Sequence, residues 1–319
     1  MALVLGIDSS TLSCKALLVD AATGEVVDEG RATHPDGTEV DPRAWVDAME
    51  QATAGLLDRA DAVSVAGQQH GMVALDADGE VVRDALLWND TRSARAAEQL
   101  IDELGGPAAC VDLTGSRYVA SITASKLRWM RDHEPENAAR TASVLLPHDY
   151  LTWHLSERGE KVTDHGEASG TGYYSTRERR WLPELAERAL GHDVELPRLA
   201  GPNERVGVVA ASVNAAAAAR GPGIGAGPRA HHGAAVGRAL QPGDVSVSIG
   251  TSGVASAVVP DSVHDSAGMV TGFADASGRY LPLVCTLNAA RVLDMGRRLL
   301  GVDWEEFENL ALASDPGAG

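Results

Sequence analysis

Residues 3–20 read LVLGIDSSTLSCKALLVD, and this stretch decides the fold that we expect for the chain. An apolar run ends at Asp8, a turn of Ser and Thr follows, and a second apolar run begins at Ala16. The pattern predicts a β-hairpin with a buried stem and a polar tip. Backbone N–H groups at such a tip can bind phosphate oxygens, and a carboxylate at a strand end can hold Mg²⁺. The stretch suggests phosphoryl transfer from ATP, although an ordinary hairpin with a polar turn fits it equally well.

The elements after this hairpin follow an informative order. A third strand is predicted over residues 25–30, and Asp41-Pro42 predicts the start of a helix with one apolar face. A further strand is predicted over residues 62–66. This β-β-β-α-β order resembles the start of the ribonuclease-H-like fold of actin and hexokinase. We therefore expect an α/β chain of this ATPase type, in which the first hairpin holds the nucleotide phosphates.

A second hairpin pattern lies far from the first. Residues 245–259 read VSVSIGTSGVASAVV, which is again an apolar strand, a turn of small polar residues and an apolar strand. Since 319 residues favour two domains, we expect one hairpin in each domain, binding phosphates from two sides. A crossing linker near residues 196–204 divides the chain into residues 1–205 and 206–319. No closing element is evident before Gly319, so the second domain is expected to be incomplete.

The composition excludes several classes of partner. A formal net charge of −18 argues against nucleic acid, because phosphate backbones require basic patches. No segment is long and apolar enough to span a membrane, and no charged leader is evident, so we expect a soluble, cytoplasmic protein. Three scattered cysteines indicate neither disulfides nor a metal site. An excess of acids with only three lysines is typical of a salt-loving cytoplasm, or of a GC-rich gene.

Polar blocks follow several of the predicted strands, where ligands bind in open α/β sheets. They read GQQHG at residues 67–71, LWNDTR at 87–92 and DHGEASGT at 164–171. Together with the two hairpins, in this order, they resemble the motifs of the FGGY carbohydrate kinases, and most closely those of the xylulokinases among them. The resemblance covers most of residues 3–259.

The resemblance implies roles for individual residues, with ATP and Mg²⁺ as cofactors and a small sugar as substrate. Asp8 would organise Mg-ATP and hold the metal. The phosphate-binding residues would be Ser10, Thr11, Lys15, Gly250, Thr251 and Ser252, and the sugar-binding residues would be Gln69, His70, Trp88, Asn89 and Asp90. Simpler interpretations remain open: a core histidine at 70, plain packing at 88, a helix cap at 90 and a solvated lysine at 15.

The family's catalytic base is an Asp in a Gly-Asp-Asn-Ala-Ala segment before the second hairpin, and this segment is altered here. Aligned backwards from Gly237, the base falls on Ala230 and its Asn neighbour on His231; aligned forwards from Gly227, it falls on Pro228. No general base is therefore identified, although His231 or His232 can titrate near neutrality. The Ala-, Gly- and Pro-rich composition over residues 214–232 suggests a pair of compensating frame slips. The DNA sequence of the gene over this stretch tests the hypothesis, because another reading frame should then encode Gly-Asp-Asn.

The resemblance implies transfer of the ATP γ-phosphoryl group to a ketopentose, D-xylulose to xylulose 5-phosphate. Two alternatives remain open. In the first, the chain is a catalytically impaired or inactive remnant that can bind sugar but lacks the catalytic Asp and the adenine site. In the second, it is a kinase for another substrate such as ribulose, glycerol or gluconate, because Gln69 replaces the Met that is usual in xylulokinases. The sequence also leaves open whether the chain forms a homodimer.

Overall fold

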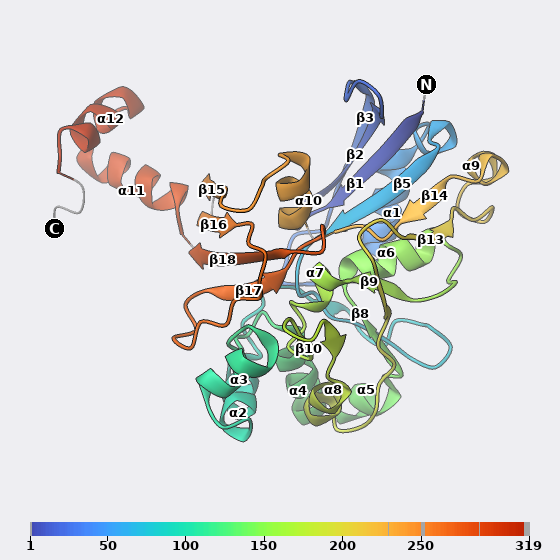
Figure 1. Cartoon of the computed structure of the whole chain (residues 1–319), viewed down its shortest axis with the longest axis horizontal. Helices are drawn as coiled ribbons and strands as arrows, with labels where there is room; N and C mark the ends of the chain where they lie inside the picture. The colour runs from blue at the N-terminus through green and yellow to red at the C-terminus, as the bar shows by residue number, and fades with distance from the viewer. Residues whose placement is uncertain (1, 229, 250–252, 287, 316–319) are drawn as a thin grey trace.

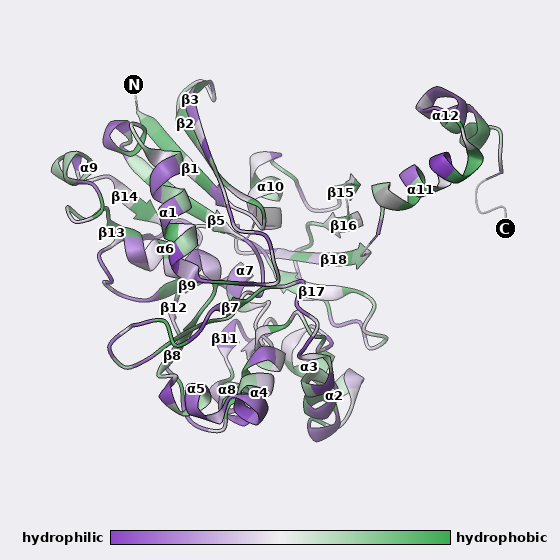
Figure 2. Cartoon of the chain, turned by 180° about the vertical axis from the view of Figure 1, so that it is seen from behind, coloured by the Kyte–Doolittle hydropathy of each residue, from purple (hydrophilic) through white to green (hydrophobic). Residues whose placement is uncertain are grey.

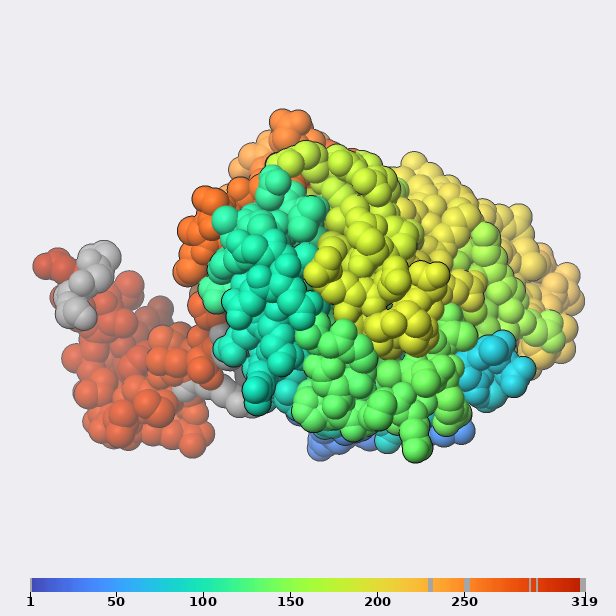
Figure 3. Space-filling view, turned by 90° about the horizontal axis from the view of Figure 1, so that it is seen from below, coloured from blue at the N-terminus to red at the C-terminus, as the bar shows by residue number. Residues whose placement is uncertain are grey.

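The computed structural model describes residues 2–228, 230–249, 253–286 and 288–315. Figure 1 shows a central sheet that contains the N-terminus, a helical layer below it, and a smaller C-terminal sheet to one side. Two C-terminal helices project away from these layers (Figures 1 and 3). This arrangement of sheets and helices is the actin- and hexokinase-like ATPase fold expected from the sequence.

The central sheet has six strands in the order β13-β14-β5-β1-β2-β3. The hairpin predicted at the N-terminus is present as two antiparallel strands, with Asp8 opposite Lys15. β5 is parallel to β1, and β14 is parallel to β5. The strands are β1 (Leu3–Ser9), β2 (Ser13–Asp20), β3 (Val26–Thr33), β5 (Ala62–Gly67), β13 (Arg205–Val208) and β14 (Gly223–Gly225). The division of the chain at residue 205 stays a prediction, and the central sheet itself continues beyond it to β14.

Helix α1 (Pro42–Thr53) covers one part of this sheet and begins where the sequence predicts. The Asp41 side chain caps it by accepting a hydrogen bond from the backbone N–H of Arg43. Trp45 and Met49 are fully buried in the core that α1 shares with the sheet. The contact with β3 is close: a Cβ added to Gly30 would lie 2.0 Å from the carbonyl oxygen of Ala52. Glycine is therefore required at this position of β3.

The helical layer forms a second core with its own apolar cluster. It holds α2 (Ala94–Glu103), α3 (Pro107–Thr114), α4 (Thr123–His133), α5 (Pro135–Arg140) and α8 (Pro183–Leu190). Short strand pairs join it to the sheet: β4 (Glu39–Val40) with β7 (Ala85–Leu86), β6 (Val73–Leu75) with β8 (Ser143–Leu145), β9 (Val162–Asp164) with β12 (Arg198–Ala200), and β10 (Tyr174–Ser175) with β11 (Arg180–Trp181). The remaining helices before residue 229 are η1 (Leu57–Arg59), α6 (Pro147–Leu155), α7 (His165–Ala168) and α9 (Ala215–Arg220).

The C-terminal sheet has four antiparallel strands in the order β15-β16-β18-β17. They are β15 (Val245–Ile249), β16 (Gly253–Ala257), β17 (Thr271–Ala274) and β18 (Tyr280–Thr286). β15 and β16 form the second predicted hairpin, whose turn residues Gly250, Thr251 and Ser252 lie outside the described residues. The helices here are α10 (Ala230–Gly237), α11 (Ala290–Leu300) and α12 (Trp304–Leu312).

Apolar side chains on this part of the chain stay exposed, as we expect for an incomplete domain. Val245, Val247 and Ile249 on β15 are each at least 62% exposed, and Leu299 and Leu312 are exposed on the last two helices. Figure 2 shows hydrophobic and hydrophilic residues side by side along α11 and α12. Among the described helices, none has the length and apolar character needed to cross a membrane.

Candidate active site

Three parallel strands of the central sheet bring the predicted site residues to one edge. β1, β5 and β14 all run in the same direction. Their carboxyl ends therefore lie together, and they lead into Ser10, Gln68 and Ala226 respectively. Ligands bind at this edge in open α/β sheets.

Asp8 lies at this edge with its carboxylate poorly solvated. Its Oδ1 is buried and has no hydrogen-bond partner among the described residues. Burial raises the pKa of Asp8, and the nearby positive charges of Lys15 and His34 oppose this shift. A buried carboxylate oxygen without a donor is suited to a hydrated cation. Lys15 itself is exposed on β2 directly opposite Asp8.

At the tip of the first hairpin, donors that we expect to be available for phosphate are hydrogen-bonded within the hairpin. The backbone N–H and the hydroxyl of Ser10 both donate to the carbonyl oxygen of Ser13, each at 3.1 Å. Thr11 Oγ1 accepts a hydrogen bond from Trp88 Nε1 at 2.9 Å. The hairpin predicted to bind phosphate is thus joined directly to the predicted sugar-binding block.

A cavity of about 790 Å³ lies beside this tip. All five predicted sugar-binding residues line it, together with Ser10 and Thr11. Its wall is completed by Gln68, Thr91, Gly268, residues 117 and 119–122, and Val254, Thr271, Phe273, Leu283 and Cys285 of the C-terminal sheet. The cavity therefore lies between the helical layer and the C-terminal sheet. Asp8 and Lys15 do not line it.

The amide groups of Gln68 and Gln69 are suited to a polyhydroxylated ligand. Gln68 is 5% exposed, and neither atom of its amide has a hydrogen-bond partner among the described residues. The amide nitrogen of Gln69 is also buried without such a partner. Buried polar groups are normally hydrogen-bonded, because an unpaired one costs about 1–3 kcal/mol. Sugar hydroxyls can both donate to and accept from such amides.

His70 is held in a strained and well-defined position in this cavity. Its φ of 62° is left-handed, which is uncommon for residues other than glycine and often marks functional sites. Its Nδ1 donates to the carbonyl oxygen of Gly170 at 2.7 Å, which directs Nε2 away from this contact. Thr123 Oγ1 donates to the carbonyl oxygen of His70, and the ring lies 5.8 Å from that of Phe273. The motifs around residues 70 and 170 thus meet in space.

We expect Gly170→Ala to disturb this position. A Cβ at residue 170 would lie 2.6 Å from Nδ1 of His70, so the imidazole must move. Binding of sugar should weaken about tenfold, equivalent to about 1.4 kcal/mol. Gly237→Ala is the matched control, because a Cβ there meets nothing within 4 Å. Calorimetric titration checks this, and equal affinities for the two variants would contradict it.

Asp90 has structural partners on both oxygens. Thr38 Oγ1 donates to Oδ2 at 2.8 Å, and the backbone N–H and Nε of Arg92 donate to Oδ1 at 3.0 and 2.9 Å. Although burial opposes it, these contacts lower the pKa of Asp90. Ser93 occupies the N-cap position of α2, but its side chain donates to the carbonyl oxygen of Ala120 and does not cap the helix. Asp90 thus lines the cavity as a fixed, ionised group.

The segment expected to hold the catalytic base begins at the end of β14. Gly227 has a φ of 67°, and a Cβ there would lie 2.1 Å from the carbonyl oxygen of Val65. Pro228 comes next, and Ala230 begins α10. The side chains of Ala230 and His231 lie outside the described residues. His232 is fully buried, with its Nδ1 2.3 Å from a Cβ built at Gly166.

Comparison with known proteins decides the family. Residues 3–227 match the N-terminal domain of the FGGY family of carbohydrate kinases. The chain belongs to this family.

The relatives of this FGGY chain are similar over nearly all of it. A xylulose kinase of Streptomyces coelicolor is 47% identical over 96% of this chain and 64% of its own length. A xylulose kinase of Haemophilus influenzae is 31% identical over 98% of this chain and 68% of its own length. The crystal structure of xylulose kinase from Bifidobacterium adolescentis superposes with a TM-score of 0.91 at 41% identity, over 99% of this chain and 71% of that one. The chain thus spans about 64% of the first relative's length.

Several groups at the FGGY site were not predicted from the sequence. They are Gln68, the wall residues at 117 and 119–122, Phe273, and the buried pair His148 and Asp149. Only Gln68 had a signal, since it lies within the GQQHG block. The others depend on contacts between distant parts of the chain.

His148 forms a hydrogen bond with the backbone just after the end of β14. Its Nδ1 lies 2.9 Å from Asp149 Oδ1, and its Nε2 lies 2.7 Å from the carbonyl oxygen of Ala226. Since both partners accept, both ring nitrogens donate, which makes this side chain an imidazolium. Burial lowers the pKa of His148, but the hydrogen bond to Asp149 and neighbouring carboxylates outweigh it and raise the pKa to about 9.

This raised pKa predicts a pH dependence of stability. The contribution of His148 is fully present below its unfolded pKa of 6.5 and is lost as the pH rises through about 9. The difference in unfolding free energy between the wild type and His148→Asn should therefore shrink from pH 6 to pH 10, by at most about 3 kcal/mol. Urea denaturation at both pH values measures it. A difference that grows with pH would contradict the imidazolium.

Proposed function

We propose that this chain provides the sugar-binding part and the first phosphate hairpin of a kinase that converts D-xylulose to xylulose 5-phosphate. The observation that carries the proposal is the cavity in which the Gln68 amide and the Gln69 amide nitrogen, both without a partner among the described residues, lie beside His70. It has room for a pentose, and Thr11 of the hairpin lies at its border. The names of the relatives support the same substrate.

ATP and Mg²⁺ are the cofactors that we propose for this reaction. Asp8 fits the metal, because its buried Oδ1 has no donor among the described residues and burial, which raises its pKa, leaves its charged form in need of a cation. A magnesium ion bound there supplies charge neutralisation for the phosphate groups. The γ-phosphoryl group passes to the terminal hydroxyl oxygen of the sugar, ADP leaves, and the hydroxyl proton must go to a base.

The absence of a carboxylate at Pro228 favours a second candidate function. A chain with an intact sugar cavity and no proton acceptor would bind xylulose and transfer the phosphoryl group very slowly, if at all. General-base catalysis contributes about 10²–10⁴-fold to such reactions. The two candidates share the binding step and differ in turnover.

An ADP-release assay tests the proposed function. Purified protein is incubated with MgATP and D-xylulose, with ribulose, glycerol and gluconate in parallel. Turnover that is highest with xylulose supports the kinase, while xylulose binding without ADP release supports the sugar-binding remnant. Higher turnover with another of these compounds would overturn the choice of substrate.

A further inference from the structure

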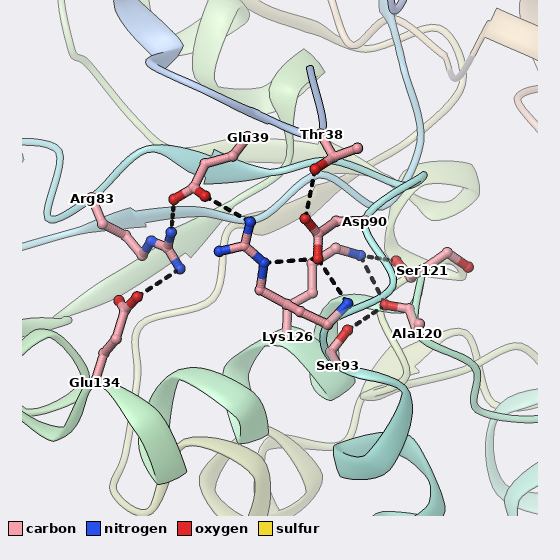
Figure 4. A network of polar contacts seen from close by, with 10 residues as sticks. Thr38, Glu39, Arg83, Asp90, Ser93, Ala120, Ser121, Lys126 and Glu134 are labelled. Carbon is pink, nitrogen blue, oxygen red and sulfur yellow. Dashed lines mark hydrogen bonds and ion pairs between the residues drawn. The ribbon is translucent and has the colours of Figure 1, made fainter.

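Lys126 is a fully buried lysine on α4, directly behind the wall of the cavity. It has no exposed surface, whereas Lys15 and Lys161, the other lysines of the chain, lie at or near the surface. Its Nζ donates to the carbonyl oxygens of Ala120, at 3.3 Å, and of Ser121. Both residues line the cavity. Figure 4 shows the ammonium lying between these carbonyls and Asp90.

The surroundings of Lys126 connect two walls of the cavity. Ser93 Oγ donates to the same carbonyl oxygen of Ala120 at 2.8 Å. Asp90, on the other wall, is the charged group that acts on Lys126. Arg92 forms ion pairs with both Asp90 and Glu39. The lysine thus holds the backbone of residues 120–121 on one side and lies within the field of the Asp90 carboxylate on the other.

A buried ammonium needs a reason, because an apolar side chain of the same length costs less to bury. Burial lowers the pKa of Lys126 to about 7, although the charge of Asp90 opposes this. A methionine would fill the same volume without this cost. Strongly perturbed groups beside a cavity are candidates for functional roles.

We infer that Lys126 is a positioning residue of the sugar site, which holds the 120–121 wall opposite Asp90 in the geometry that binds the sugar. This inference rests on the proposed function. Lys126 lies behind the wall and does not line the cavity, so its effect reaches the sugar through Asp90 and the two carbonyl groups. Nucleotide binding, which we place at Asp8 and the hairpin tip, should be independent of it.

The test compares Lys126→Met with Lys161→Met, in which an ion pair with Glu195 at the surface is lost instead. Affinities for D-xylulose and for MgADP are measured separately by calorimetry, with circular dichroism as the folding control. We expect Lys126→Met to bind xylulose about tenfold or more weakly and MgADP unchanged, and Lys161→Met to bind both as the wild type does. Equal xylulose affinity of the two variants would overturn the inference.

A second measurement needs no variant. Asp90 stays ionised above pH 6.5 because its pKa is lowered, whereas Lys126 loses its charge as the pH rises through about 7. Wild-type xylulose affinity should therefore fall several-fold between pH 6.5 and 8.5, and that of Lys126→Met should not. A flat wild-type profile would overturn the inference even if the variant fails to fold. Complete absence of xylulose binding by the wild type would instead contradict the proposed function.

Discussion

Under the proposed function, replacing Pro228 with Asp is expected to raise kcat for xylulose phosphorylation by about 10²–10⁴-fold. Pro228 follows β14, whose carboxyl end lies at the same edge of the sheet as those of β1 and β5. Gly227, with its left-handed φ and its close approach to Val65, leads the chain into this position. A carboxylate at residue 228 would supply the proton acceptor that the FGGY resemblance places in this segment.

Two further variants show whether the gain comes from a base at this position. The Asn side chain of Pro228→Asn has nearly the shape of Asp but cannot accept the proton, so this variant should give no comparable increase in kcat. Ala230→Asp tests the other alignment of the segment. If Pro228→Asp gains no more than Pro228→Asn, residue 228 is not the base position, and a gain confined to Ala230→Asp would move it to the start of α10.

Asp8→Asn should change activity and stability in opposite directions. We expect MgATP-dependent phosphoryl transfer to fall by about 10²–10³-fold, since the carboxylate that organises the metal is lost. Without nucleotide, the thermal midpoint should rise, because burial raises the pKa of Asp8 and so makes its charged form unfavourable near neutral pH. Functional groups often reduce stability in this way.

The matched control for Asp8→Asn is Asp28→Asn, an exposed acid on the same sheet that pairs with Arg59. Exposed ion pairs contribute about 0–1 kcal/mol, so this change should leave both kcat and the thermal midpoint nearly unchanged. Kinetic assays at saturating xylulose and thermal denaturation without ligand measure the two effects. A lower midpoint for Asp8→Asn would show that Asp8 has a structural role instead.

Much of the fold could be predicted from local sequence patterns, and the family resemblance singled out residues that the structure places around one cavity. Strand alternation and the polar tip predicted the first hairpin, and Asp41-Pro42 predicted the start of α1. Residues of the blocks at 67–71 and 87–92 line the cavity together, and their contact with sugar stays a prediction. These features succeed because each depends on residues that are close together in the chain.

The rest depends on contacts that no local pattern encodes. Trp88 bonds to Thr11 across 77 residues, and His70 to Gly170 across 100. The burial of Lys126 is not evident from α4 alone, where it reads as an ordinary helix cation. The same holds for Ser10, because the sequence does not show that its backbone N–H and its hydroxyl both donate to the carbonyl oxygen of Ser13.

Calorimetric titration of D-xylulose tests the central claim, that the cavity at Gln68–His70 binds a ketopentose, most directly. We predict that the wild type binds with a Kd in the range of about 1 μM to 1 mM, which is usual for metabolic substrates. Gln68→Leu, which removes the buried unpartnered amide at similar size, should lose at least about tenfold in affinity while remaining folded. Equal affinities of wild type and Gln68→Leu, or no binding by the wild type, would contradict this account.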